Sequence, residues 1–195
     1  MAPAAPVVER LPLFADMMAA ARNAGRCIVR DFAPASPDGI ALFNSLPCRV
    51  EIADLPDALP GLQKLRDETA FTARIRELLP LRPAHPASIV LCWDLLNYFP
   101  RGAISKLMDH VADLCQPGAR VHALIAYSSP EMPARPARYL LAGTDSVRVS
   151  PDADTTRESP RYAPNDLMRC LPRFEMDHAM MLRNGYQEYC LRRIG

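Results

Sequence analysis

The residues best suited to chemistry follow a short apolar run near the middle of the chain. Trp93, Asp94, Asn97 and Tyr98 come directly after Ile89-Val90-Leu91-Cys92. Such a run predicts a buried strand, and open α/β sheets bind ligands at the carboxyl ends of their strands. Asp94 is therefore a candidate general base or orienting group, with Tyr98 as a second catalytic candidate. The alternative role for Asp94 is to cap the following helix.

A helix and a second strand follow this cluster. Apolar residues recur at the i, i+3, i+4, i+7 spacing of a helix that covers a sheet, at Ile104, Leu107, Met108, Val111 and Cys115. Pro117-Gly118 then predicts a turn into a strand over residues 121–127, which ends at Tyr127. Asn97 and Tyr127 are the substrate-binding candidates, because both stand at strand ends.

The first half of the chain predicts one βαβ unit. Strands are expected over residues 26–32 and 48–54, with a brief helix between them, and each strand ends in an acid, Asp31 and Asp54. A helix is expected over residues 57–79. The sequence shows no convincing strand between that helix and Ile89, which indicates that one sheet strand is short or missing.

The two flanking regions are a tail with a helix (residues 1–25) and a Pro-rich segment (residues 128–163). Helical spacing in the first includes Met17 and Met18, with Gly25 as the C-cap, and we expect this helix to pack on the sheet. The second is expected to be a long irregular insertion or lid. Its five arginines are candidates for contact with an anionic substrate, although a solvated loop is the commoner role.

The chain ends with a predicted antiparallel hairpin. A short helix is expected from Pro164, followed by strands over 174–182 and 186–192 that Asn184-Gly185 joins. Asn-Gly between two strand-like runs is the strongest local hairpin signal.

Composition restricts the partners. The net charge is +1 and the arginines are scattered, so no nucleic-acid partner is expected. No apolar run reaches the ~20 residues of a membrane span, and the N-terminus lacks a basic region followed by an apolar one, so we expect a cytoplasmic protein without membrane contact. The six cysteines form no CxxC pair and are expected to be buried thiols. No histidine pair has metal-ligand spacing, so no metal is expected.

The order of these elements resembles a class I S-adenosylmethionine (SAM)-dependent methyltransferase, over roughly residues 26 to 193. Residues 89–99, Ile-Val-Leu-Cys-Trp-Asp-Leu-Leu-Asn-Tyr-Phe, resemble the element after the fourth strand of small-molecule methyltransferases. Residues 114–121 resemble the family's Leu-x-Pro-Gly-Gly turn, and the final hairpin also matches. The resemblance implies one domain over residues 1–195: a Rossmann-like α/β sandwich with a mostly parallel sheet and a C-terminal antiparallel β-hairpin.

The resemblance also implies a SAM site. In the family, the first strand ends in an acid followed by a glycine-rich loop, and the second ends in an acid that binds the ribose. The matching cofactor-binding candidates are Asp31, Ala33, Ala35, Gly39, Asp54, Leu55 and Trp93. The loop departs from the family because alanine, serine and proline replace its glycines, leaving Gly39 alone. These replacements remove the conformational freedom of glycine and, at the prolines, an amide donor.

Three functions follow as hypotheses. The first is a SAM-dependent methyltransferase that acts on a small molecule. The second is a catalytically inactive homologue that serves as a binding or regulatory partner of another protein. The third is a flavodoxin-like or nucleotide-binding domain, against which the terminal Asn-Gly hairpin argues. The sequence does not name the methyl acceptor or the oligomeric state.

Overall fold

The computed structural model describes residues 6–150 and 155–195. Residues 1–5 of the expected tail, and Pro151 of the expected insertion, lie outside the described residues. Among the described residues, no helix is long and apolar enough to cross a membrane.

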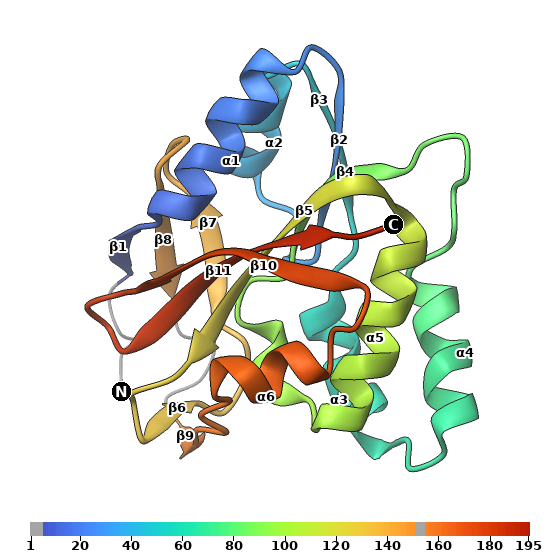
Figure 1. The fold of residues 1–195 in the computed structure, drawn as a ribbon. Helices are drawn as coiled ribbons and strands as arrows, with labels where there is room; N and C mark the ends of the chain where they lie inside the picture. The colour runs from blue at the N-terminus through green and yellow to red at the C-terminus, as the bar shows by residue number, and fades with distance from the viewer. Residues whose placement is uncertain (1–5, 151–154) are drawn as a thin grey trace.

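A six-stranded sheet forms the centre of the molecule (Figure 1). Its strand order is β10-β11-β5-β4-β2-β3. The strands are β2 (Cys27–Asp31), β3 (Cys48–Ile52), β4 (Ala87–Leu91), β5 (Cys115–Ala126), β10 (Phe174–Met181) and β11 (Tyr186–Arg193). Neighbours among β3, β2, β4 and β5 are parallel, whereas β11 is antiparallel to both β5 and β10. The predicted mostly parallel α/β sheet is confirmed. The described residues between β3 and β4 form no strand of this sheet, as the sequence indicated.

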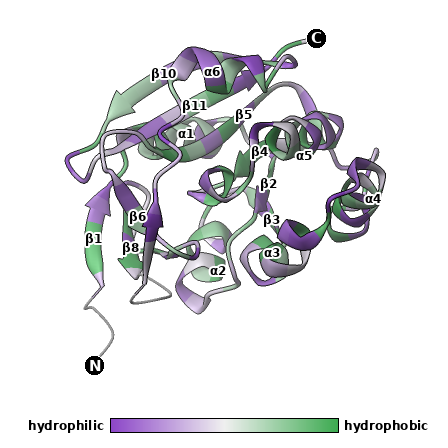
Figure 2. Cartoon of the chain, turned by 90° about the horizontal axis from the view of Figure 1, so that it is seen from below, coloured by the Kyte–Doolittle hydropathy of each residue, from purple (hydrophilic) through white to green (hydrophobic). Residues whose placement is uncertain are grey.

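Helices cover both faces of the sheet (Figure 2). The helices are α1 (Pro12–Asn23), α2 (Pro37–Asn44), α3 (Leu55–Lys64), α4 (Glu68–Leu78), the 3-10 helix η1 (Leu95–Tyr98), α5 (Arg101–Leu114) and α6 (Pro164–Arg169). One hydrophobic core joins α3 to α6 with one face of the sheet, and a second core joins α1 and α2 with the other. Two covered faces explain why β4 reads as a continuous apolar run rather than an alternating one.

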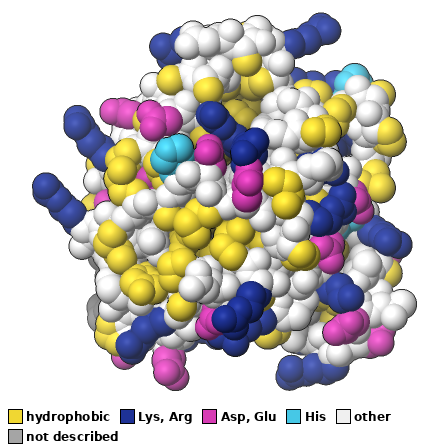
Figure 3. All heavy atoms as spheres, in the orientation of Figure 1, with side chains coloured by type: hydrophobic (Ala, Val, Ile, Leu, Met, Phe, Trp, Pro, Cys, Tyr) yellow, Lys and Arg dark blue, Asp and Glu magenta, His cyan; other side chains and the backbone are white. Residues whose placement is uncertain are grey.

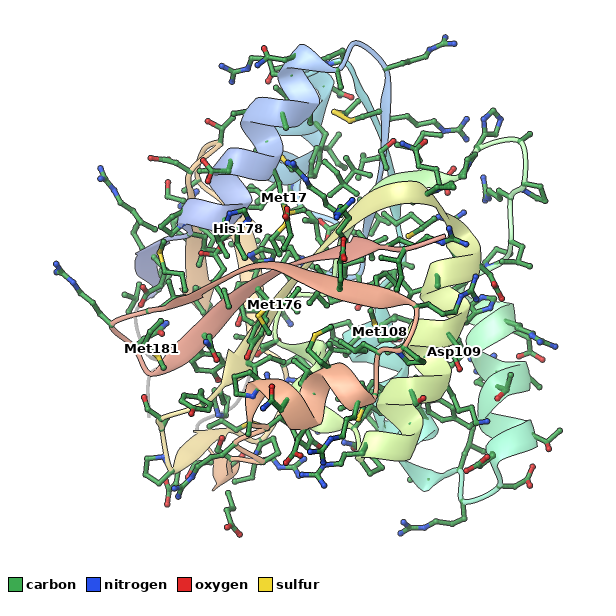
Figure 4. All side chains as sticks on the ribbon, in the orientation of Figure 1. Met17, Met108, Asp109, Met176, His178 and Met181 are labelled. Carbon is green, nitrogen blue, oxygen red and sulfur yellow. A yellow bond between two sulfur atoms is a disulfide. The ribbon has the colours of Figure 1, made fainter. Side chains whose placement is uncertain are left out.

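Helix α1 is fixed on the sheet by an acid of β11. The Glu188 carboxylate is fully buried and accepts hydrogen bonds from the backbone N–H groups of Leu13 and Phe14, at 3.2 and 2.8 Å. It also lies 2.9 Å from Nε2 of His122 on β5. A carboxylate at a helix N-terminus satisfies free donors and complements the helix dipole. Met17, labelled in Figure 4, is buried in the core beneath α1, so the expected packing of this helix is confirmed.

The helix expected over residues 57–79 is wrong, because two helices occupy this stretch. Leu65 leaves the helical region after α3, and Asp67 begins α4 by accepting a hydrogen bond from the N–H of Ala70 at 2.7 Å. An aspartate N-cap competes locally with continuation of a helix. The break gives α3 its own direction, and α3 borders the site described below.

The expectation of an irregular segment over 128–163 is also wrong for its described residues. The segment contains β6 (Glu131–Pro133), β7 (Arg138–Leu141), β8 (Ser146–Ser150) and β9 (Thr156–Glu158). Strand β1 (Val7–Arg10), in the expected tail, pairs with β8 to form a three-stranded sheet of order β1-β8-β7. Strands β6 and β9 form a separate pair.

Two further expectations are corrected near the ends of strands. Cys27 and Cys48 form a disulfide between neighbouring parallel strands, although buried thiols were expected; the other four cysteines are free and buried. Pro117-Gly118 does not separate α5 from β5, because β5 already begins at Cys115. The pair instead lies at a register irregularity, where Gly118 adopts a φ of 76°.

The C-terminal strands form the expected hairpin, with Gly185 at a φ of 85° in the turn. Strand β10 lies at the edge of the sheet. Its Met176 and Met181 are exposed and labelled in Figure 4. Apolar side chains gather on the same face of the molecule in Figure 3. The hairpin therefore forms one end of the sheet, and β10 pairs within the sheet with β11 alone.

Candidate functional site

The candidate site lies where β2 and β4 end side by side. From β2 the chain passes to β3 on one side, and β4 and β5 lie on the other, so this is the topological switch point at which open α/β sheets bind ligands. Asp31 ends β2 and Trp93 follows β4. The indole Nε1 of Trp93 donates to Oδ1 of Asp31 at 2.7 Å, and the N–H of Ala33 donates to the same oxygen at 2.9 Å. Burial raises the pKa of Asp31 to about 6, against the lowering effect of these hydrogen bonds.

Trp93 has an unusual backbone and a fully enclosed ring. Its φ is 51°, in the left-handed region, which costs roughly 1–2 kcal/mol for a residue with a Cβ. The ring stacks on Tyr139 of β7, with centroids 5.0 Å apart and an interplanar angle of 9°. It also contacts the rings of Phe14 and His122. Strained residues are concentrated at functional sites, and here the strained residue holds a ring at the switch point.

Asp94 binds the backbone of a later segment of the chain, around Ala137, that crosses the site. Its side chain is buried, and Oδ2 accepts a hydrogen bond from the N–H of Ala137 at 3.1 Å. Burial raises the pKa of Asp94 to about 7, although the Ala137 N–H and the Tyr139 and Tyr98 hydroxyls lower it. A carboxyl with this pKa is suited to proton transfer near neutral pH. The alternative role, capping the helix that begins near Pro100, is not seen: α5 follows Pro100 without a side-chain cap, and the Asp94 side chain does not cap η1 either.

Tyr98 and Asn97 also bind backbone groups. The Tyr98 hydroxyl donates toward the carbonyl oxygens of Pro133 and Arg135, at 3.0 and 2.7 Å. The Asn97 amide donates to the carbonyls of Asp94 and Leu124, and its Oδ1 accepts from the N–H of Ala126. Asn97 thus ties η1 to the end of β5 and presents no free polar atom to a ligand.

We call residues 130–141, which include β6 and β7, the strap. Ala137 binds Asp94, Tyr139 stacks on Trp93, and two strap carbonyls accept from Tyr98. The sequence analysis did not identify Ala137 or Tyr139 as site residues. The only local signal was the Arg-Tyr-Leu-Leu run of β7, which is too short to separate a strand from a loop. The strap covers the inner end of the site, next to Asp31.

The loop after β2 does not need glycines, because its residues adopt backbone conformations that other residue types allow. Among the described residues, the only non-glycine residues with positive φ are Trp93 and Arg161, so no loop residue is left-handed. The Ser36 hydroxyl caps α2 by accepting from the N–H of Gly39 at 3.0 Å. Ala33 is buried and Ala35 is exposed. The loop therefore forms without strain, but the Gly39 N–H is already used.

Asp54 lies beside an open crevice. Its side chain caps α3 by accepting from the N–H of Asp57 at 3.2 Å, so the capping role is present, and the residue remains exposed. Leu55 is buried in the core. The crevice has a volume of about 370 Å³ and lies between the loop after β2, helix α3 and the strap. We call this cavity the Asp54 crevice; its lining includes Pro34, Asp54, Leu59, Gln63, Ala137 and Arg138.

The remaining predicted residue lies away from this cluster. Tyr127 follows β5, is about one third exposed, and its backbone N–H donates to the carbonyl of Gly185. Among the residues that the structure describes, no group of three or more His, Cys, Asp or Glu side chains is placed to hold a metal ion. The structure thus brings Asp31, Trp93, Asp94 and Tyr98 together, with Asp54 at the rim.

Comparison with solved structures shows which fold this is. A SAM-dependent methyltransferase from Clostridium acetobutylicum aligns with a TM-score of 0.53 and 10% identity, over 93% of this chain and 91% of that one. The Burkholderia thailandensis 1,6-didemethyltoxoflavin-N1-methyltransferase, solved with 1,6-didemethyltoxoflavin and S-adenosylhomocysteine, gives 0.52 and 14%, over 94% and 77%. The glycopeptide N-methyltransferase MtfA complexed with SAM gives 0.51 and 13%, over 93% and 92%. No protein-family model and no curated protein sequence matches this chain. The chain has the Rossmann-like fold of class I SAM-dependent methyltransferases.

Proposed function

We propose that this chain is a SAM-dependent methyltransferase that acts on a small molecule and binds the adenosyl end of SAM in the Asp54 crevice. The observation that carries the proposal is an open cavity at the switch point of a methyltransferase fold, with a carboxylate at its rim. The volume, about 370 Å³, falls in the range of roughly 300–1,000 Å³ typical of ligand pockets. Two structural neighbours were solved with SAM or its demethylated product, which supports the same ligand here.

The residues fit the two ends of SAM unequally. At the outer end, one oxygen of Asp54 caps α3, and the exposed carboxylate keeps acceptor capacity for ribose hydroxyls. At the inner end, Tyr139 and Ala137 of the strap fill the space against Trp93 and Asp94. We infer that the strap moves aside when SAM binds and makes this space available.

SAM, when bound, supplies an activated methyl group for in-line displacement. The protein therefore mainly aligns donor and acceptor and keeps water out. Asp94 would accept the proton that an N–H or O–H acceptor releases, because its pKa of about 7 suits that transfer. The strap would exclude water once it closes again.

Calorimetric titration with SAM and S-adenosylhomocysteine tests the proposal. Asp54→Ala and Asp67→Ala form a matched pair, because each removes the aspartate N-cap of a helix on the same face of the sheet, and only Asp54 lines the crevice. Both changes should cost about 0.5–2 kcal/mol of stability. Only Asp54→Ala should weaken SAM binding, by about tenfold or more. Equal effects of the two variants on affinity would count against the Asp54 crevice as the cofactor site.

A catalytically inactive homologue is the second candidate, and one observation favours it. At the inner end of the site, Trp93 is hydrogen-bonded to Asp31 and stacked on Tyr139. The protein's own side chains thus fill the space that a cofactor would need. This function predicts no heat with SAM at millimolar concentration from a folded protein. The same titration therefore separates the two functions.

A further inference from the structure

A second cavity lies beyond the Asp54 crevice, on the side of η1. Its volume is about 310 Å³, it is open to solvent on one side, and it is bordered by the end of α3, the start of α4, the η1–α5 junction, and β9 with the segment that follows it. The two cavities share one wall residue, Gln63, whose Nε2 donates to the carbonyl of Tyr98 at 2.9 Å. A ligand in the second cavity would therefore lie next to one in the crevice.

Aromatic rings form the fixed walls of this cavity. Phe71 and Phe99 contact each other edge to face, with centroids 5.8 Å apart. The hydroxyls of Tyr98 and Tyr162 are held by backbone carbonyls, that of Tyr162 by the carbonyl of Phe99 at 2.6 Å. The two tyrosines therefore present ring surface rather than free hydroxyls, and one face of each ring is already covered by a guanidinium, Arg157 over Tyr98 and Arg101 over Tyr162. Such aromatic walls favour a ligand that carries an aromatic ring, which can stack on one wall and meet another edge to face.

The charged groups that line the cavity are two arginines, Arg66 and Arg157, and no acid lines it. Neither guanidinium forms a salt bridge with any residue that the structure describes, whereas Arg101 and Arg148 pair with aspartates. The Arg157 guanidinium instead lies over the Tyr98 ring, 5.9 Å from its centroid. Both arginines are exposed at the mouth of the cavity, where a planar guanidinium can pair with a carboxylate through two parallel hydrogen bonds.

We propose that the second cavity binds a small aromatic carboxylate, with the ring between the aromatic walls and the carboxylate on Arg157 and Arg66. The claim that this ligand is the methyl acceptor rests on the proposed methyltransferase function. The claim that the cavity binds it does not. The segment 128–163 thus contributes an arginine to an anion site, the role that the sequence analysis weighed against a solvated loop.

Calorimetric titration of the full chain with 4-hydroxybenzoate, without SAM, tests this site. The matched probe is 4-hydroxybenzamide, which has the same shape without the charge. We expect saturable binding of the carboxylate, and binding of the amide weaker by about tenfold or more, because the amide lacks the charge-assisted hydrogen bonds to the guanidinium groups. Equal affinity for the two probes, or no heat with the carboxylate at millimolar concentration, would overturn the proposal.

Three variants locate the binding. Arg157→Gln and Arg66→Gln should each weaken 4-hydroxybenzoate binding by about tenfold. Arg22→Gln is the control, because Arg22 is exposed on α1, across the sheet, and has no salt bridge within the described residues. Ala103→Leu should also weaken binding, since Ala103 lines the cavity and the larger side chain fills it without changing the charge. Thermal melting confirms that each variant folds.

A final titration in the presence of S-adenosylhomocysteine separates this proposal from the cofactor site. If the two ligands bind together, the second cavity is distinct from the Asp54 crevice. If S-adenosylhomocysteine displaces 4-hydroxybenzoate competitively, the arginines belong to the cofactor site and the proposal fails. If 4-hydroxybenzoate binds with the expected dependence on Arg157 but SAM does not bind, the anion site stands and the methyltransferase function falls.

Discussion

The indole N–H of Trp93 donates to Oδ1 of Asp31 across the switch point of the sheet, at 2.7 Å. This bond joins the ends of β2 and β4, two strands that are neighbours in the sheet but far apart in sequence. It also sets the plane on which Tyr139 stacks. The acid that would face a cofactor in a methyltransferase thus serves here as an acceptor for the protein's own indole.

Removal of that donor is expected to destabilise the protein. Trp93→Phe leaves Oδ1 of buried Asp31 with the Ala33 N–H alone. A lost hydrogen bond to an ionisable group costs about 1.5–3 kcal/mol, to which the smaller ring adds. A double-mutant cycle with Asp31→Ala, which removes the acceptor, followed by urea unfolding, isolates the coupling between the two side chains. Additive effects of the two changes would show that the bond contributes nothing measurable.

Loosening the strap should strengthen SAM binding. Tyr139→Ala removes the ring that stacks on Trp93 and empties the inner end of the site. We expect severalfold tighter SAM binding and faster protease cleavage within residues 130–141. Trp93 is the only tryptophan of the chain, so its fluorescence reports the change directly. Tyr127→Ala, at an exposed residue after β5, is the control; weaker SAM binding by Tyr139→Ala would show that the strap helps to bind SAM.

The two buried carboxyls make stability depend on pH. The folded chain raises the pKa of Asp31 to about 6 and of Asp94 to about 7, from the usual 3.8, mainly through burial. The folded state therefore binds more protons than the unfolded state between about pH 4 and 7. This contribution to stability is present at about pH 4 and is lost as the pH rises through 6 and 7.

Asp94→Asn should remove much of this dependence. The amide oxygen still accepts from Ala137, and no charge is buried at high pH. We expect the variant to be more stable than the wild type at pH 8 by about 1–4 kcal/mol, and to lose that advantage below about pH 5. Urea unfolding at several pH values measures this. A constant difference between the two proteins at all pH values would show that Asp94 does not titrate in this range.

The disulfide should contribute measurably to stability. Cys27 and Cys48 are 21 residues apart and join the first residues of β2 and β3 across α2. A crosslink of this length contributes about 2–4 kcal/mol. Cys48→Ser should lower the melting temperature, and a reducing agent should lower that of the wild type but not of the variant. Cys170→Ser, at a free thiol, is the control. Disulfides are rare in cytosolic proteins, so this bond does not support the predicted cytoplasmic location, which stays a prediction.

The sequence predicted the parts of the fold that have strong local signals. The βαβ unit, the apolar run of β4 and the Asn184-Gly185 turn each depend on periodicity or turn chemistry within a few residues. The strap strands β6 and β7 are three and four residues long, so no local pattern marks them. Strands β1 and β8 pair although more than a hundred residues of sequence separate them. Tertiary pairing decides such short strands.

The sequence predicted which residues lie at the site, but not the residues that they contact there. Asp31, Trp93, Asp94 and Tyr98 lie together because strand ends meet at one edge of a parallel sheet. Their partners Ala137 and Tyr139 come from a segment whose path depends on distant pairing. A signal for the disulfide was available, since Cys27 and Cys48 lie at the starts of the two expected parallel strands and so fall opposite each other.

The pairing of β1 with β8 connects the N-terminal region to the strap. Val7–Arg10 hydrogen-bonds to β8, β8 to β7, and β7 carries the ring that covers Trp93. The backbone N–H of Leu11 adds a bond to the carbonyl of Asp145. We therefore expect a tag or truncation near residue 7 to disturb β7 and Tyr139, more than a hundred residues further along the chain. Tags for assays of this protein are therefore better placed after Gly195, where they leave the pairing of β1 with β8 intact.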